Sequence, residues 1–184
     1  MITKAIIHDN RLKGRAPGSE QGYRLYRVNA NVSLVSAFRH IANDSRSHGG
    51  IDELLVMCHG YESHENEEMQ MSTIQARGGY GLQLGVEGLS RSNVWLLSSL
   101  KDKVQKIVIY SCATADIATG GQGSHHDGRE FCREIALITN AEVIASSAIQ
   151  MYNPNIGEGR IDFSFWEGSV YNFSPSGVVS PHRS

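Results

Sequence analysis

The chain has 184 residues, which is enough for one domain with a sizeable core that needs no disulfide or metal to hold it together. Its 40% hydrophobic and 20% charged residues are typical of ordinary globular proteins and exclude disordered and fibrous classes. Seventeen Lys and Arg residues against nineteen Asp and Glu give a net charge of -2, without a basic stripe, so no nucleic-acid partner is expected.

Neither a membrane span nor an export signal is predicted. The longest apolar runs fall far short of the ~20 residues that a span needs. The stretch from Met1 to Asp9 lacks the apolar centre and cleavage site of a secretory signal. Cys58, Cys112 and Cys132 are an odd number at wide spacing, unlike a disulfide framework or a zinc knuckle. We expect a cytoplasmic protein, with export by a route that uses no cleavable signal left open.

The first part of the chain predicts two strands, a helix and a buried strand. Residues 4–8 and 23–28 have strand composition, and a loop with Gly and Pro separates them. Apolar residues recur at three and four positions over residues 31–44, which predicts a helix. Residues 54–57, Leu-Leu-Val-Met, form a short apolar run typical of a central strand buried on both faces.

An acidic stretch dominates the next part. Residues 61–80 have no sustained period, which predicts an exposed loop. Alternation over residues 81–86 indicates a small strand. A helix through residues 95–100 is expected to follow, with Ser90 or Ser92 as its N-cap.

Two further strands and one helix are predicted in the last third. Residues 107–110 are rich in β-branched side chains without alternation, which indicates a second central strand. After a Gly-rich loop, a helix is expected at Asp127, with Glu130 as its capping-box partner. Residues 141–146 predict another buried strand.

These elements predict one α/β domain over residues 1–184. Apolar strands that alternate with helices favour a mostly parallel central sheet with helices on both faces. The segments 161–166 and 169–173 indicate a β-hairpin, in a C-terminal extension from about residue 155. Reactive groups in such sheets gather at the carboxyl ends of the strands.

Two chemistry-bearing segments directly follow the two central strands. His59-Gly60 comes after residues 54–58, and Cys112 comes after residues 107–111. Neighbouring parallel strands lie about 4.8 Å apart, so both side chains would emerge at one edge. An imidazole beside a thiol favours the nucleophilic thiolate. The backbone N–H groups of Gly60 and Cys112 are expected to bind a developing oxyanion.

This arrangement resembles the caspase-like cysteine peptidases of clan CD, in which one apolar strand ends in His-Gly and another ends in the nucleophilic Cys roughly 50 residues later. Here the motifs are residues 54–60 and 107–113, and residues 81–84 and 111–115 look most like bacterial CHAT-type domains. The resemblance implies a caspase-like three-layer sandwich and a Cys112–His59 dyad. It also implies hydrolysis of peptide bonds through a thioacyl intermediate, without metal or cofactor.

The chain departs from the caspase pattern around the nucleophile. The Gln-Ala-Cys-x-Gly signature is absent, so strict aspartate specificity is not implied. Tyr110 stands where an acidic residue would favour Arg or Lys substrates. For the substrate pocket we single out Asp116, the nearest acid to the nucleophile, with Ser146 and Ser147 after the next strand.

The alternative function is a catalytically inactive caspase-like module that binds or regulates a protein partner. The loop 61–80, or the aromatic hairpin with Trp166 and Tyr171, would then form the contact. No metal is expected, because several histidines lack the spacing that places ligands on one helix face. These are His48, His64, His125 and His126. Either function has a protein or peptide as its partner.

Overall fold

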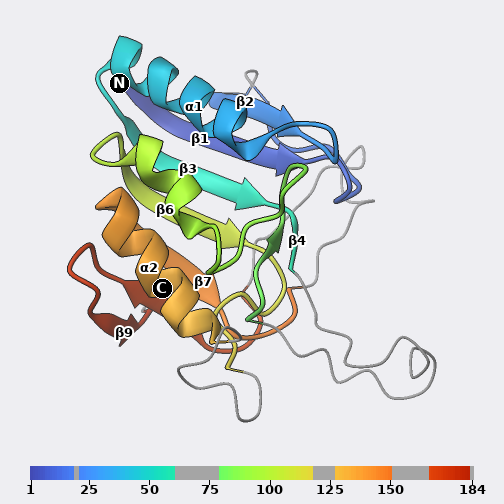
Figure 1. The fold of residues 1–184 in the computed structure, drawn as a ribbon, viewed down its shortest axis with the longest axis vertical. Helices are drawn as coiled ribbons and strands as arrows, with labels where there is room; N and C mark the ends of the chain where they lie inside the picture. Colours follow the sequence, from blue (N-terminus) through green and yellow to red (C-terminus); the bar gives the residue numbers. More distant parts are fainter. Residues whose placement is uncertain (19–20, 61–78, 118–126, 151–165, 183–184) are drawn as a thin grey trace.

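A computed structural model describes residues 1–18, 21–60, 79–117, 127–150 and 166–182 of the chain. A seven-stranded sheet has the order β2-β1-β3-β6-β7-β8-β9, and its first five strands run parallel (Figure 1). These strands are β1 (Ile2–Asp9), β2 (Tyr23–Val28), β3 (Ile51–Met57), β6 (Val104–Tyr110), β7 (Glu142–Ser146), β8 (Val170–Phe173) and β9 (Val179–Pro181). The predicted α/β fold with a mostly parallel central sheet is therefore confirmed.

All the helices of the described residues pack on one face of this sheet, which corrects the expectation of helices on both faces (Figure 1). They are α1 (Leu34–His48), the 3-10 helix η3 (Val94–Leu100) and α2 (Gly128–Thr139). Their apolar side chains form one core with alternate strand residues such as Ile7, Val56 and Ile109.

The opposite face carries a smaller apolar cluster that includes Ile6, Leu55 and Val108. Leu12 belongs to this cluster, and Trp166 packs against it with its ring stacked on that of Tyr110 at 4.8 Å between centroids. Both faces of the central strands are buried, as their continuous apolar runs predicted. Such a run does not encode whether a helix or an irregular segment covers each face, so the number of layers could not be derived from it.

Helix α1 confirms the predicted helix, shifted towards the C-terminus. Its N-terminal N–H group, that of Leu34, donates to the Glu87 carboxylate at 2.8 Å, and the Ser33 hydroxyl donates to the same carboxylate at 2.7 Å. This cap comes from a residue more than 50 positions away, so the local pattern could not locate the start. The helix ends at Gly49, which has the left-handed conformation that favours glycine.

The two other helices differ in how well their starts were predicted. Asp127 caps α2 as expected, because its carboxylate accepts from the N–H groups of Arg129 and Glu130 at 3.1 Å. The prediction of Ser90 or Ser92 as N-cap was wrong. Helix η3 follows Asn93, whose side chain accepts from the Ser90 N–H and donates to the Gly88 carbonyl, and so closes the preceding turn.

The C-terminal hairpin exists, but with a different pairing. Strand β8 pairs antiparallel with β7 on one side and with β9 on the other. Trp166 lies outside any strand, and residues 161–165 lie outside the described residues. The turn between β8 and β9 contains Pro175 and Gly177, and Gly177 has a φ of 83°. This is a stronger turn signal than Glu167-Gly168.

The small strand predicted before η3 lies within the described residues, whereas the two predicted loops are described only in part. Of the small strand expected over residues 81–86, only β5 (Leu82–Gln83) forms. Most of the acidic loop 61–80 and of the Gly-rich loop after Cys112 falls outside the described residues, as do His64, His125 and His126. Within the part of the chain that is described, no helix has the length and apolar character that crossing a membrane requires.

Candidate active site

The register of two central strands brings His59 and Cys112 to the same edge of the sheet. Strands β3 and β6 are parallel neighbours, and Met57 pairs with Tyr110 in their ladder. His59 and Cys112 each stand two residues beyond this pair. Both residues are partly exposed. The two residues singled out in the sequence are thus together at the carboxyl end of the sheet, within reach of solvent.

Gly60 packs directly on the backbone of the candidate nucleophile. Strand β4 (His59–Gly60) leaves the main sheet and pairs antiparallel with β5. A Cβ atom on Gly60 would overlap the carbonyl oxygen of Cys112 and would lie 3.3 Å from the Ser111 hydroxyl. Only glycine permits so close an approach. The segment that carries His59 therefore touches the segment that carries Cys112.

The imidazole of His59 is held by a backbone carbonyl. Its Nε2 atom lies 3.2 Å from the carbonyl oxygen of Arg11, in the turn after β1. A carbonyl oxygen can only accept, so Nε2 carries the proton and donates it. In the neutral ring this leaves the lone pair on Nδ1. Residue 11 was not singled out in the sequence, because a backbone acceptor leaves no trace in residue type.

A buried ion pair holds that turn in place. The Asp9 carboxylate is completely buried and accepts from the Arg11 guanidinium at 2.8 and 2.6 Å. It also accepts from the N–H groups of Arg11 and Gly85, each at 3.0 Å. Burial by itself raises the pKa of Asp9, but these hydrogen bonds outweigh it and hold the pKa below its usual value.

Burial separates Cys112 from the other two cysteines. Cys58 and Cys132 are buried, and burial raises the pKa of Cys58 to about 12 and also raises the pKa of Cys132. Cys112 is partly exposed, and its thiol donates to the Gln150 carbonyl over 3.8 Å. Cys112 is therefore the one of the three cysteines whose side chain is within reach of molecules in solution.

The turn after Cys112 contains an unusual backbone conformation. Ala113 has a φ of 47°, in the left-handed region that residues with a Cβ adopt at a cost of about 1–2 kcal/mol. Its N–H group donates to the Ala148 carbonyl at 2.8 Å, and the Ala115 N–H group donates to the Ser146 carbonyl at 2.9 Å. The end of β7 and the segment that follows it thus hold the turn and fix the direction in which the chain leaves Cys112.

The three residues expected to line a substrate pocket surround this turn in different ways. Ser146 is completely buried, and its hydroxyl donates to the Glu167 carbonyl at 2.5 Å and accepts from the Ala148 N–H group at 3.1 Å. Ser147 is partly exposed and donates to the Ser169 carbonyl at 3.2 Å. Asp116 is partly exposed, and its backbone bonds to Ala113 and Gly128. Ser146 therefore supports the turn, whereas Ser147 and Asp116 remain candidates for substrate contact.

The described residues do not bring together three or more His, Cys, Asp or Glu side chains in a way that could hold a metal ion. Comparison of the chain with models of known protein families, with curated proteins and with solved structures gave no significant match. The chemistry of the site must therefore be inferred from its own geometry.

Proposed function

We propose that the protein is a cysteine endopeptidase in which Cys112 is the nucleophile and His59 moves the proton. The observation that carries the proposal is the register of β3 and β6, which sets the two residues at equal distance beyond one strand pair. The contact between Gly60 and the Cys112 carbonyl supports it, because this contact joins the two segments at the level of the site.

The reaction would proceed in two halves. The thiol proton of Cys112 passes to Nδ1 of His59, the nitrogen that the bond to Arg11 leaves with a lone pair. The sulfur then bonds to the scissile carbonyl carbon, and the C–N bond breaks as the imidazolium protonates the leaving amine. Water hydrolyses the resulting thioester and restores the thiol.

The developing oxyanion needs backbone donors at the carboxyl end of β6. We assign this role to the N–H groups of Cys112 and Gly60, because Cys112 stands at the carboxyl end of β6 and Gly60 packs directly on its backbone. The substrate class is a polypeptide, and the side chain that precedes the cut would be selected near Asp116 and Ser147.

A peptide library analysed by mass spectrometry tests the proposal, together with labelling by peptide-based acyloxymethyl ketones. We expect cleavage and labelling by the wild type, loss of both in Cys112→Ala, and a fall of at least about 100-fold in His59→Ala. His48→Ala is the matched control, because His48 is exposed at the far end of α1. Cleavage retained by Cys112→Ala would overturn the proposal. A wild type that binds a protein partner but is neither active nor labelled would favour the inactive module.

A further inference from the structure

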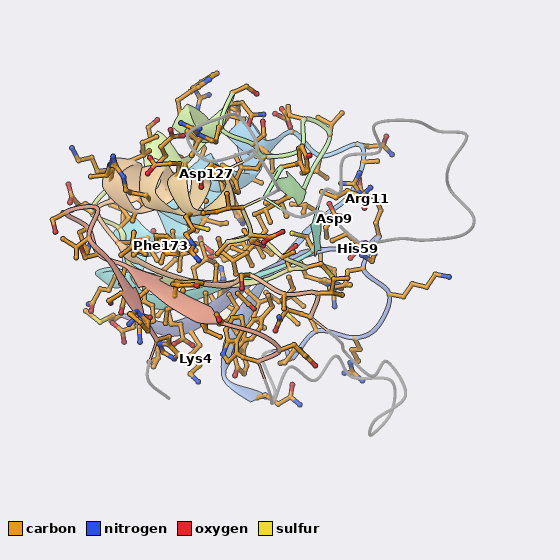
Figure 2. The ribbon with its side chains drawn as sticks, turned by 90° about the horizontal axis from the view of Figure 1, so that it is seen from below. Lys4, Asp9, Arg11, His59, Asp127 and Phe173 are labelled. Atoms are coloured by element: carbon orange, nitrogen blue, oxygen red, sulfur yellow. The ribbon has the colours of Figure 1, made fainter. Side chains whose placement is uncertain are left out.

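We infer that Asp9 is a positioning residue for His59, acting through Arg11. The catalytic consequence of this inference rests on the proposed function, whereas its structural content does not. Asp9, Arg11 and His59 lie together at one end of the molecule, remote from Lys4 near the start of β1 (Figure 2). Their side chains and backbones form one continuous set of hydrogen bonds.

The first connection runs through the Arg11 backbone. Asp9 accepts from the Arg11 N–H group at 3.0 Å and from the guanidinium at 2.8 and 2.6 Å, so one carboxylate holds both the backbone and the side chain of Arg11. The carbonyl of the same residue accepts from Nε2 of His59 at 3.2 Å. Any movement of the turn at Arg11 therefore moves the acceptor that orients the imidazole.

The second connection runs through the strand that pairs with His59. Asp9 accepts from the Gly85 N–H group at 3.0 Å, and the Arg11 guanidinium donates to the Gly85 carbonyl at 2.7 Å. Gly85 follows β5 by two residues, and Gln83 of β5 pairs with His59. The Asp9–Arg11 pair thus holds two backbone segments next to His59. One is the turn whose carbonyl binds the imidazole, and the other is the segment after β5, the strand that pairs with the main chain of His59.

A carboxylate is required at this position. It receives four donors, two from a planar guanidinium and two from the backbone, which an ionised carboxylate can accept at once. The amide of asparagine presents two N–H donors in place of one oxygen, so it would face the donors of Arg11 or Gly85 and leave the guanidinium without a counter-charge. The expected result is a displaced turn, even though asparagine has the same size.

Solution NMR of the full chain with 15N-labelled histidine tests the inference without reference to activity. The ring 15N shifts of His59, identified by their loss in His59→Ala, report its tautomer and its hydrogen bond. In Asp9→Asn we expect the Nε2–H signal of His59 to move towards that of free histidine. Asp44→Asn is the matched control. Like Asp9, Asp44 accepts hydrogen bonds from two nitrogens of one guanidinium, that of Arg24, but it lies at the other end of the sheet. It should leave His59 unchanged.

A second variant covers the case in which Asp9→Asn does not fold. Arg11→Lys keeps the backbone carbonyl and a positive charge beside the buried Asp9 carboxylate, but it removes the planar guanidinium that bonds Asp9 twice and the Gly85 carbonyl once. Because the buried carboxylate keeps a counter-charge, this change is expected to leave the fold intact and to shift the His59 signals in the same direction, by a smaller amount. Unchanged His59 signals in a folded Asp9→Asn or Arg11→Lys protein would overturn the inference.

The labelling rate of Cys112 then separates the inference from the proposed function. A misplaced catalytic group can lower the rate by up to about 100-fold. In Asp9→Asn we therefore expect two results together: a shifted His59 signal, and acylation of Cys112 that is about 10- to 100-fold slower. A shifted ring in a protein whose wild type is never acylated would sustain the positioning role and reject the peptidase. An unshifted His59 ring in Asp9→Asn, with acylation of Cys112 at the normal rate, would reject the positioning role and leave the proposed peptidase standing.

Discussion

The two ends of the parallel sheet use the same Asp–Arg chemistry in opposite ways. At the carboxyl end, the side chain of Asp9 has no exposed area, and that of its partner Arg11 is 29% exposed. At the amino end, Asp44 holds Arg24 at 2.7 Å, but the Arg24 side chain is 52% exposed and the Asp44 side chain 16%. The first pair organises the backbone around the His59 ring, and the second joins a helix to an edge strand. Burial, not the pair itself, makes the difference.

The largest expected difference is in the rates at which the three cysteines are alkylated. Burial raises the pKa of the Cys58 thiol to about 12, so at pH 8 it is protonated, and its side chain is also out of reach of reagents. Iodoacetamide at pH 8 should therefore modify Cys112 first, and Cys58 and Cys132 only after unfolding in urea. Peptide mapping by mass spectrometry measures the three rates. Equal rates in the folded protein would contradict the burial that separates these residues.

Replacing the carboxylates compares the two ion pairs directly. Asp9→Asn should lower the free energy of unfolding by about 3–5 kcal/mol, because it leaves a partly buried guanidinium without its partner. Asp44→Asn should cost about 1 kcal/mol or less, as surface pairs do. Urea unfolding followed by circular dichroism gives both values. Similar losses from the two variants would mean that burial does not set the strength of these pairs.

The contribution of the Asp9 carboxylate to the free energy of unfolding is also expected to depend on pH. The pKa of Asp9 is lower in the folded protein than its usual value, so its contribution to stability is present above about pH 4 and is lost as the pH falls through the folded pKa. The gap in unfolding free energy between the wild type and Asp9→Asn should therefore narrow between pH 7 and pH 3. A gap that widens on acidification would reverse the sign of this linkage.

Two glycines at opposite ends of the sheet allow the cost of steric overlap to be compared with the cost of a left-handed backbone conformation. Gly60→Ala should cost about 1–3 kcal/mol through overpacking, because its Cβ would overlap the Cys112 carbonyl. It should also slow the labelling of Cys112. Gly49→Ala has open space but a φ of +77°, so it should cost about 1–2 kcal/mol and leave Cys112 unaffected. Normal labelling of Cys112 in Gly60→Ala would show that this contact does not shape the site.

The smallest expected effect concerns Ala113. Ala113→Gly removes the strain of a left-handed residue but adds the flexibility of glycine in the unfolded chain, so the net gain in unfolding free energy should stay below about 1 kcal/mol. Asn140, with a φ of 54° at the end of α2, is a comparison from the amino end. Because Asn tolerates this conformation and also donates to Asp102, Asn140→Gly should not stabilise the protein. Calorimetry resolves such differences.

The apolar runs at residues 54–57 and 107–110 predicted two central strands, and their ends predicted where His59 and Cys112 would lie. These features are local, because a buried strand needs consecutive apolar residues and a strand end exposes whatever follows it. The cap of α2 was predictable for the same reason, since Asp127 and the N–H groups that it accepts from are sequence neighbours.

Three features came only from the tertiary structure: the cap that Glu87 places on α1, the packing of all the described helices on one face of the sheet, and the connections from Asp9 to His59. Each depends on groups that are distant in sequence or on backbone atoms that every residue type shares. A carbonyl such as that of Arg11 has no signature in the sequence, because its role is set by where the chain brings it. The sequence by itself determined which strands are buried and which reactive residues end them; only the folded chain decided which groups orient those residues.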